Sequence, residues 1–323
     1  MLYPLKFKPI LKETVWGGKR LANKGNIQNP DATIGESWEI SGVQDNLSIV
    51  SEGALADNTL EELIGVYMGD LVGDHVYDTF GIEFPLLIKY IDAQQNLSIQ
   101  VHPDDAIAKE RHHAYGKTEM WYLIDATPDA SLILGFHKDT DTSEYLAHLQ
   151  KGTLPDLLHT QPVRRGDCFF IPAGTVHAIN AGCFIAEIQQ TSDITYRLFD
   201  YNRLDRNGLP RELHTELATE VINYRTEEHR IPYHNHPNHT EELVDCKYFT
   251  TNYLKFNREI EKDYIELDSF VVYMCLSGQF TLVYDIDQSV HVNAGETVLV
   301  PACFKSIFLI PDKEAEILEI YIS

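Results

Sequence analysis

Short segments in which hydrophobic and polar residues alternate dominate the pattern of this chain. In residues 97–104, Ser98, Gln100 and His102 fall on one side of an extended strand and aliphatic residues on the other, because successive strand side chains point to opposite faces. Taken alone, such a segment is typical of a strand with one face in water. A strand whose polar side faces the inside of a barrel has the same pattern, and later segments favour this second interpretation.

Helical spacing of hydrophobic residues occurs in residues 57–80, where Asn58 or Thr59 is placed as a cap, and again in residues 143–158 and 211–224. The helices interrupt the strands irregularly, and we find no glycine-rich phosphate loop, which argues against Rossmann and P-loop folds. We therefore predict a mainly β protein in which helical insertions lie near the mouth of a jelly-roll barrel.

One strand motif recurs near the end of the chain. Residues 166–173 and 295–302 share a glycine-acidic turn, a hydrophobic strand and a proline corner. The first copy continues to His177, whereas the second has Ser306 at the corresponding position. We predict two jelly-roll barrels in two domains, residues 1–228 with a metal site and residues 229–323 as a degenerate copy without metal ligands.

Residues with metal-binding side chains occur in three strand-like segments. His102 ends the first segment, Glu119 lies in the segment 117–124, and His177 directly follows a Pro/Gly corner. With Gln100 as a possible fourth ligand, this nitrogen and oxygen set suits zinc or another first-row divalent ion. A barrel interior gathers side chains from separate strands, so we predict one metal site there.

Four blocks of the sequence resemble the signature blocks of type I mannose-6-phosphate isomerases, which are zinc enzymes of the cupin fold. The blocks are Gln100-Val101-His102-Pro103, Lys117-Thr118-Glu119, Pro172-Ala173-Gly174-Thr175-Val176-His177 and residues 187–197. The resemblance is closest to the short bacterial branch and extends over essentially the whole chain. It implies two cupin barrels and one Zn²⁺ per chain, held by His102, Glu119 and His177. Gln100 matches a ligand position of the longer members, which also carry a His where this chain has Gly116.

The resemblance also implies an activity, the interconversion of mannose 6-phosphate and fructose 6-phosphate through an enediol. It assigns Arg197 to phosphate or transition-state charge, Glu187 to a general acid/base role, and Asp193 to orienting Arg197 or to proton transfer. Lys117 is a third candidate for the proton-carrying group, and the sequence leaves the choice open. Two other functions stay open as well, a metal-dependent cupin oxygenase and a non-catalytic cupin that binds sugar phosphates.

The charge balance narrows the possible partners. The chain has 26 basic and 49 acidic residues, a net charge of −23, which argues against nucleic acids and anionic membranes as partners. An anionic sugar phosphate must then meet a local positive cluster, for which we predict Lys89, Lys117 and Arg197, with Ser98 on the same polar face.

The cysteines and the N-terminal residues indicate the cellular compartment of the protein. The five cysteines are odd in number and widely spaced, which favours reduced thiols and a reducing compartment. The N-terminal residues lack the pattern of a signal peptide, and no segment is long and apolar enough to span a bilayer. We expect a cytoplasmic protein, monomeric or homodimeric.

Overall fold

The computed structural model describes residues 1–24, 32–205 and 208–323. The chain forms two compact units. The central unit comprises Leu11–Trp38 and Leu86–Arg230, and the terminal unit comprises Met1–Ile10, Glu39–Pro85 and Ile231–Ser323. Strands predominate in both units, which confirms the prediction of a mainly β protein.

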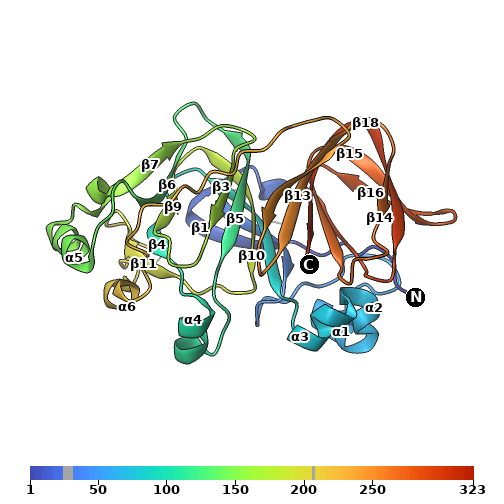
Figure 1. Cartoon of the computed structure of the whole chain (residues 1–323), viewed down its shortest axis with the longest axis horizontal. Coiled ribbons are helices and arrows are strands. Elements are labelled where there is room, and N and C mark those ends of the chain that lie inside the picture. The colour runs from blue at the N-terminus through green and yellow to red at the C-terminus, as the bar shows by residue number, and fades with distance from the viewer. Residues whose placement is uncertain (25–31, 206–207) are drawn as a thin grey trace. The chain divides into compact units, whose positions relative to one another are not determined.

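A six-stranded sheet forms one half of the central unit, in the order β1-β2-β3-β10-β5-β8 (Figure 1). Its strands are β1 Ile10–Gly18, β2 Ile34–Ser41, β3 Leu86–Ala93, β5 Glu119–Ala126, β8 Cys168–Ile171 and β10 Cys183–Gln190. Strand β10 pairs antiparallel with β3 on one side and with β5 on the other. This register places Glu187 opposite Lys89 and opposite Trp121, at the centre of the sheet.

A five-stranded sheet forms the other half, in the order β11-β4-β9-β6-β7. Its strands are β4 Ile99–Val101, β6 Ser131–Phe136, β7 Leu158–Pro162, β9 His177–Ile179 and β11 Tyr196–Phe199. Gln100 is paired with Arg197 on one side and with His177 on the other. Three residues that the sequence placed in different blocks are thus neighbours across three strands.

The core of the central unit lies between these two sheets. Trp121 and Ile185 of the six-stranded sheet pack against Leu132 and Ile179 of the five-stranded sheet. Because each sheet buries one face in this way, the two form a sandwich with side chains of both sheets inside.

A second core covers the other face of the five-stranded sheet. Ile99 and Val101 pack there against Tyr145 and Ala218, which belong to helices α5 and α6. Ile99 and Val101, of the aliphatic side of the predicted strand at residues 97–104, therefore face this outer core, whereas Leu97 belongs to the inner core between the sheets. Ser98 and Gln100 of the polar side line a cavity inside the unit. The helical elements of the central unit are η1 Ala22–Lys24, α4 Asp105–His112, α5 Thr142–Lys151, η2 Leu154–Leu157 and α6 Thr215–Thr219.

The predicted helices differ from the observed ones in length. Residues 57–80 form three short helices, α1 Leu60–Tyr67, α2 Gly69–Val72 and α3 Asp74–Phe80. The breaks fall at Met68 (φ 48°) and Gly73 (φ 95°), whose positive φ angles are incompatible with a continuous right-handed helix.

The cap prediction at the start of α1 is confirmed at Thr59. Its side chain accepts a hydrogen bond from the Glu62 backbone, and the Glu62 carboxylate accepts one from the Thr59 backbone. The other two predicted helices are shorter than expected. Residues 143–158 contain α5 followed by the 3-10 turn η2, and only the short α6 lies within residues 211–224.

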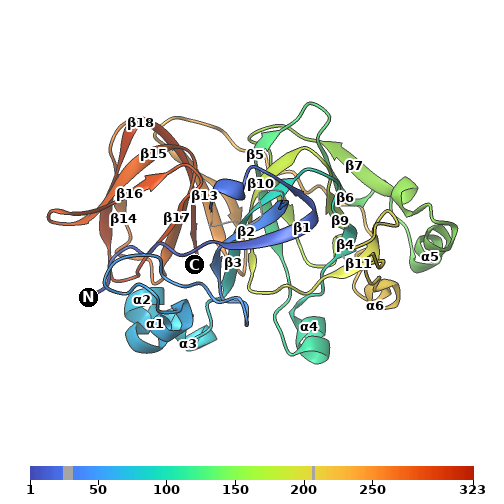
Figure 2. The same cartoon turned by 180° about the vertical axis from the view of Figure 1, so that it is seen from behind.

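The terminal unit contains a seven-stranded sheet, in the order β12-β13-β18-β15-β16 with β14 on β18 and β17 on β15 (Figures 1 and 2). Its strands are β12 Thr240–Asp245, β13 Thr250–Phe256, β14 Ile260–Asp263, β15 Val271–Asp285, β16 Gln288–Asn293, β17 Thr297–Val300 and β18 Ser306–Tyr321. The repeated motif has the same local form in both places. Gly166 (φ 86°) and Gly295 (φ 83°) each precede a four-residue strand, β8 and β17.

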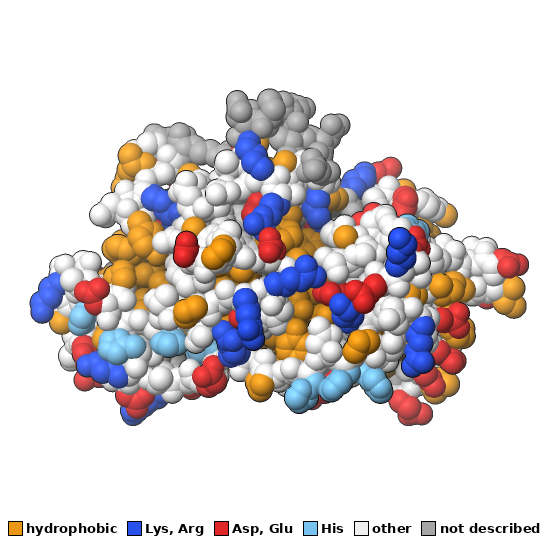
Figure 3. All heavy atoms as spheres, turned by 90° about the horizontal axis from the view of Figure 1, so that it is seen from above, with side chains coloured by type: hydrophobic (Ala, Val, Ile, Leu, Met, Phe, Trp, Pro, Cys, Tyr) orange, Lys and Arg blue, Asp and Glu red, His pale blue; other side chains and the backbone are white. Residues whose placement is uncertain are grey.

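The surface carries charged side chains of both signs (Figure 3), and the cysteines are free thiols. Lys and Arg side chains lie among Asp and Glu side chains on the face shown in Figure 3. All five cysteines carry thiols, none of them in a disulfide. Within the described residues, no helix has the length and hydropathy needed to cross a membrane.

Candidate active site

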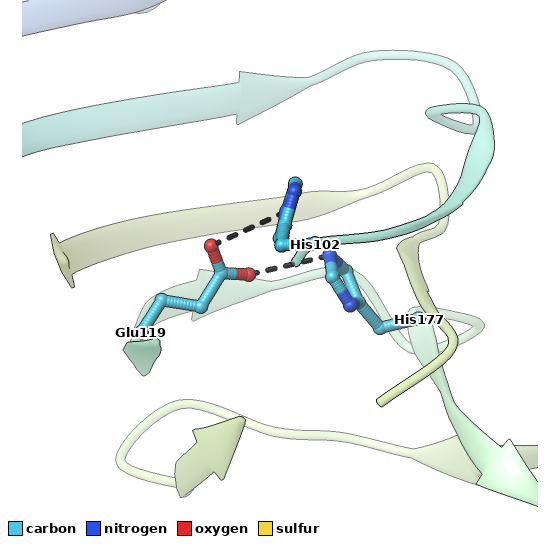
Figure 4. Close-up of side chains that lie close together, drawn as sticks. All are labelled: His102, Glu119 and His177. Atoms are coloured by element: carbon cyan, nitrogen blue, oxygen red, sulfur yellow. Dashed lines mark ion pairs between the residues drawn. The ribbon is translucent and has the colours of Figure 1, made fainter. Parts of the chain in front are cut away.

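His102, Glu119 and His177 converge inside the central unit (Figure 4). One ligand atom of each residue lies within 4.8 Å of the others, and all three side chains are buried. The His177 Nε2 atom is 3.3 Å from Glu119 Oε1, and His102 Nε2 is 3.6 Å from Glu119 Oε2. Two imidazole nitrogens around a carboxylate form a donor set that fits a first-row divalent cation.

The strands of both sheets bring these ligands together. Glu119 is the first residue of β5 in the six-stranded sheet, and His177 is the first residue of β9 in the five-stranded sheet. His102 directly follows β4, the neighbour of β9. The Gln100 amide Nε2 lies 3.3 Å from His177 Nε2, so its side chain reaches the same centre. That Gln100 ligates a metal stays a prediction.

Backbone carbonyls orient both imidazoles. The Nδ1 of His102 lies 2.8 Å from the Ile194 carbonyl oxygen, and the Nδ1 of His177 lies 2.9 Å from the Thr175 carbonyl oxygen. Because a carbonyl oxygen can only accept, Nδ1 carries the hydrogen in each ring and Nε2 presents a lone pair toward Glu119. Outer hydrogen bonds of this kind fix the tautomer of metal-binding histidines.

The charge state of the imidazoles also suits metal binding. Burial, reinforced by the Lys117 ammonium, lowers the pKa of His177 to about 3 and the pKa of His102 well below its usual value. Both rings are therefore neutral at neutral pH, which is the form that binds metals.

A row of ion-paired lysines and carboxylates extends from this centre into the six-stranded sheet. The Lys117 ammonium pairs with Glu119 and lies 3.3 Å from Glu187 Oε1. The Lys89 ammonium lies 3.5 Å from Glu187 Oε2 and 3.3 Å from Glu36 Oε2. Burial opposes the charge on Lys89, but Glu187 and Glu36 outweigh it and raise the Lys89 pKa. Both lysines, predicted as anion binders, are thus in contact with carboxylates.

Glu187 is buried at the middle of this row of ion pairs, between Lys89 and Lys117. Burial and the nearby Glu119 carboxylate raise the pKa of Glu187, against the opposing effect of Lys89 and Lys117. A carboxyl group with a raised pKa is suited to take up and release a proton near neutrality.

A cavity of about 150 Å³ opens beside the centre, lined by residues of both sheets. Eight of the ten predicted site residues line it: Lys89, Ser98, Gln100, Lys117, Glu119, Glu187, Asp193 and Arg197. His102 and His177 lie behind Glu119, with which both are in contact. Asp193 is the one exposed residue among the ten.

Arg197 approaches the cavity from β11. Its Nε donates to Ser98 Oγ at 3.3 Å, and its Nη1 donates to the Glu212 carbonyl oxygen at 3.0 Å. Burial, and after it the charge of Arg211, lowers the pKa of Arg197. A second guanidinium is therefore close to the first.

Eleven other residues that line the cavity were absent from the predicted site, among them the polar or aromatic residues Glu36, Trp38 and Arg211. Glu36 accepts a hydrogen bond from Trp38 Nε1 at 2.6 Å and contacts Lys89. Glu36 and Trp38 share one face of β2 because they are two residues apart, and this pairing was the available signal. Arg211 follows β11 in an irregular segment at the start of the predicted helix 211–224, and helical spacing gives no signal of a cavity position.

Comparisons with known proteins agree with this geometry. Residues 4–128 match the family model for the phosphomannose isomerase type I catalytic domain. The chain is 37% identical to the mannose-6-phosphate isomerase ManA of Bacillus subtilis over 87% of both chains. It is 32% identical to the mannose-6-phosphate isomerase of Streptococcus mutans over 95% of both.

Solved structures extend the similarity to the fold. The crystal structure of the mannose 6-phosphate isomerase from Bacillus subtilis matches all of this chain with a TM-score of 0.88 at 30% identity, and all of that chain is covered. A putative mannosephosphate isomerase from Archaeoglobus fulgidus, at 22% identity, shares the fold with a TM-score of 0.80. From these matches we conclude that the chain belongs to the type I phosphomannose isomerase family.

Proposed function

We propose that this protein is a zinc-dependent isomerase that interconverts D-mannose 6-phosphate and D-fructose 6-phosphate through an enediol. The observation that carries this proposal is the His102, Glu119 and His177 group beside a cavity that also holds Glu187 and Arg197. Such a cavity combines a metal site, a buried carboxyl group and a fixed guanidinium. A metal-assisted aldose/ketose isomerisation can use all three kinds of group.

We propose that His102, Glu119 and His177 hold one Zn²⁺ per chain, with Gln100 as the fourth protein ligand. The buried, neutral imidazoles and the carboxylate fit this ion by donor chemistry. When bound, zinc would act as a Lewis acid that stabilises negative charge on a substrate oxygen.

Proton transfer is assigned to Glu187 with Lys117 beside it. Isomerisation moves a proton between C1 and C2, so the group that carries it must accept and release a proton near neutrality. Burial and Glu119 raise the pKa of Glu187, which makes it a stronger proton acceptor than an ordinary carboxylate, and Lys117 lies 3.3 Å away to balance its charge after release. Positioned acid/base groups contribute about 10²- to 10⁴-fold in rate. Asp193, exposed at the cavity, is assigned to orienting the arginine side of the site.

Different parts of the substrate are assigned to groups of different charge in the cavity. Lys89 and Lys117 are paired with carboxylates, which suits contacts to sugar hydroxyl groups. Ser98 and Arg197 form a hydroxyl and guanidinium pair, which suits a phosphate group. Arg197 also supplies a fixed positive charge for the negative charge of the transition state.

Domain roles, cellular compartment and oligomeric state are assigned as follows. We assign catalysis to the domain of residues 1–228 and no metal of its own to the domain of residues 229–323. The free thiols of the cysteines support a reducing, cytoplasmic environment. The enzyme would act as a monomer or homodimer.

A coupled assay of mannose 6-phosphate conversion tests the activity, with unphosphorylated mannose as the control substrate. We expect turnover of the phosphorylated sugar, with solvent deuterium incorporated into the product when the reaction runs in D₂O, because the proton removed from carbon is held on the base and exchanges with solvent before it is returned. Oxygen consumption with metal-replete protein would instead indicate a cupin oxygenase. Binding of mannose 6-phosphate without turnover would refute the isomerase and leave a sugar-phosphate-binding role.

A further inference from the structure

Asp200 holds two guanidinium groups at the arginine side of the cavity. Arg211 donates to it in a bidentate arrangement, from Nε to Oδ2 at 2.6 Å and from Nη2 to Oδ1 at 2.5 Å. Arg203 donates from Nη2 to the same Oδ1 at 2.5 Å. Asp200 is buried, and the hydrogen bonds from both arginines outweigh burial and lower its pKa. Asp200 is therefore ionised and fixes both guanidinium groups.

The two arginines point to different surroundings. Arg211 lines the same cavity as Ser98 and Arg197. Arg203 instead donates from Nη1 to the Asn96 carbonyl oxygen, and it does not line that cavity. The bidentate pair with Asp200 engages the Nε and Nη2 atoms of Arg211, whereas a guanidinium carries five N–H donors in all. Arg211 is thus both anchored and equipped to bind a ligand in the cavity.

The protein groups on the two sides of the cavity carry opposite charge when a metal ion is left out of the count. On the metal side, two ammonium groups face three carboxylates: Lys89 and Lys117 against Glu36, Glu119 and Glu187. On the arginine side, three guanidinium groups face one buried carboxylate: Arg197, Arg203 and Arg211 against Asp200, of which Arg203 lies outside the cavity lining. The Asp193 carboxylate also lines this cavity, but it is exposed. The Glu212 carboxylate also acts on Arg197, but it is 84% exposed and lies 3.9 Å from His214. Solvent screens such an exposed charge.

An excess of guanidinium groups over buried carboxylates at the arginine side favours binding of a phosphate dianion. A phosphate monoester carries a charge of about −1.5 to −2 at neutral pH and presents three acceptor oxygens. Two guanidinium groups close enough for one to lower the pKa of the other are unfavourable together, and an anion between them relieves that repulsion.

We propose that Arg211 is a specificity residue that binds the phosphate group of the substrate together with Arg197 and Ser98. Asp200 is a positioning residue, which aims Arg211 into the cavity without contacting the substrate. This inference rests on the proposed function, since it places the 6-phosphate at the arginine side of the same cavity. It makes Arg211 the group that distinguishes a phosphorylated sugar from a neutral one.

Steady-state kinetics of Arg211→Ala with mannose 6-phosphate tests the specificity role. We expect KM to rise about 10- to 100-fold with kcat changed less than about threefold, because charge-assisted hydrogen bonds to the phosphate are lost in the ground state and transition state alike. The inhibition constant of inorganic phosphate should rise by a similar factor. The matched control is Arg225→Ala, which removes an exposed arginine paired with Asp139 at 2.9 Å and should leave both constants unchanged.

The variant Asp200→Asn tests the positioning role, because two effects oppose each other there. Losing an anchor for Arg211 raises KM, whereas removing a negative charge near the phosphate lowers it. We expect KM to rise; a fall would show that Asp200 only reduces the local charge and would overturn its positioning role. Circular dichroism and metal content of each variant check that the fold and the metal site persist.

Calorimetric titration with inorganic phosphate separates failure of this inference from failure of the proposed function. Phosphate should bind the wild-type protein and bind Arg211→Ala at least about tenfold more weakly, whether or not the protein turns over mannose 6-phosphate. If Arg211→Ala does not fold, Arg211→Lys, which keeps a point charge but loses the fork, should bind phosphate more weakly than wild type. Equal phosphate affinity in wild type and the folded variant would overturn the assignment of Arg211.

Discussion

Replacing Lys262 by methionine should strongly destabilise the terminal unit, because it leaves a buried carboxylate without its cation. The Lys262 ammonium lies 3.0 Å from Glu319 Oε1, and the Glu319 side chain is only 3% exposed. Asn252 donates to the same carboxylate at 3.0 Å and Tyr273 at 3.2 Å. These neutral donors remain in the variant but cannot balance the charge. Breaking a buried ion pair from one side costs about 3–5 kcal/mol, which we expect for the free energy of unfolding at pH 7.

The variant should also reverse the pH dependence that Glu319 contributes. In the wild type, Lys262 and the hydrogen bonds outweigh burial and lower the pKa of Glu319, so its contribution is present above the unfolded pKa and is lost as the pH falls through the folded pKa. Without Lys262, burial dominates and raises the folded pKa of Glu319. The buried, ionised Glu319 carboxylate then destabilises the folded state fully at a pH above that folded pKa. This destabilisation decreases as the pH falls toward the unfolded pKa, so acidification from pH 7 to pH 5 should increase the free energy of unfolding of the variant.

Urea unfolding followed by circular dichroism at both pH values measures this effect. The matched control is Lys255→Met, which removes a lysine of neighbouring strand β13 that is 25% exposed and pairs with Glu314 at 2.9 Å and with Glu316 at 3.3 Å near the surface. Such an exposed pair contributes about 0–1 kcal/mol. A loss below about 1 kcal/mol in Lys262→Met, or an unchanged pH dependence, would refute the reasoning.

Two further predictions concern catalysis. Glu187→Gln keeps the shape of the side chain but removes the proton acceptor, so we expect kcat to fall about 10²- to 10⁴-fold with little change in KM, measured in the coupled assay. Unchanged kcat would move the acid/base role to Lys117 or Asp193. Arg197→Ala should lower kcat/KM about 10²- to 10³-fold while metal analysis finds the zinc content of the wild type, because Arg197 binds charge on the substrate and not the metal. A loss of zinc in Arg197→Ala would place this residue in the metal site instead.

The sequence was sufficient to predict features that depend on local pattern. Alternation in residues 97–104 predicted which side of the strand carries Ser98 and Gln100, and the structure places both on the cavity. Ligand types in three separate strands predicted a convergent site, because strands of a sandwich have one inner face. Thr59 was one of two predicted caps, and the hydrogen bonds with Glu62 identify it as the observed one.

Features that depend on contacts between distant segments could not be predicted. Hydrophobic spacing runs through residues 57–80 without interruption, yet Met68 and Gly73 adopt positive φ angles that divide the helix. Lys89 was grouped with Arg197 by its charge and its place in an apolar strand near the ligand segments, but the pairing of β3 with β10 sets Lys89 opposite Glu187. Arg211 lines the cavity and is held in a bidentate pair with Asp200, and no periodic pattern records such a pair.

Metal removal and restoration is the most direct test of the central claim that His102, Glu119 and His177 form a catalytic metal site. We would measure zinc content and mannose 6-phosphate turnover on the protein as purified, after chelation and after titration with Zn²⁺. We predict that turnover falls with the metal and returns in proportion to it, reaching its full value at one zinc per chain, and that His177→Ala neither retains the metal nor recovers activity. Full turnover by metal-free protein, or stoichiometric zinc without turnover, would contradict the claim.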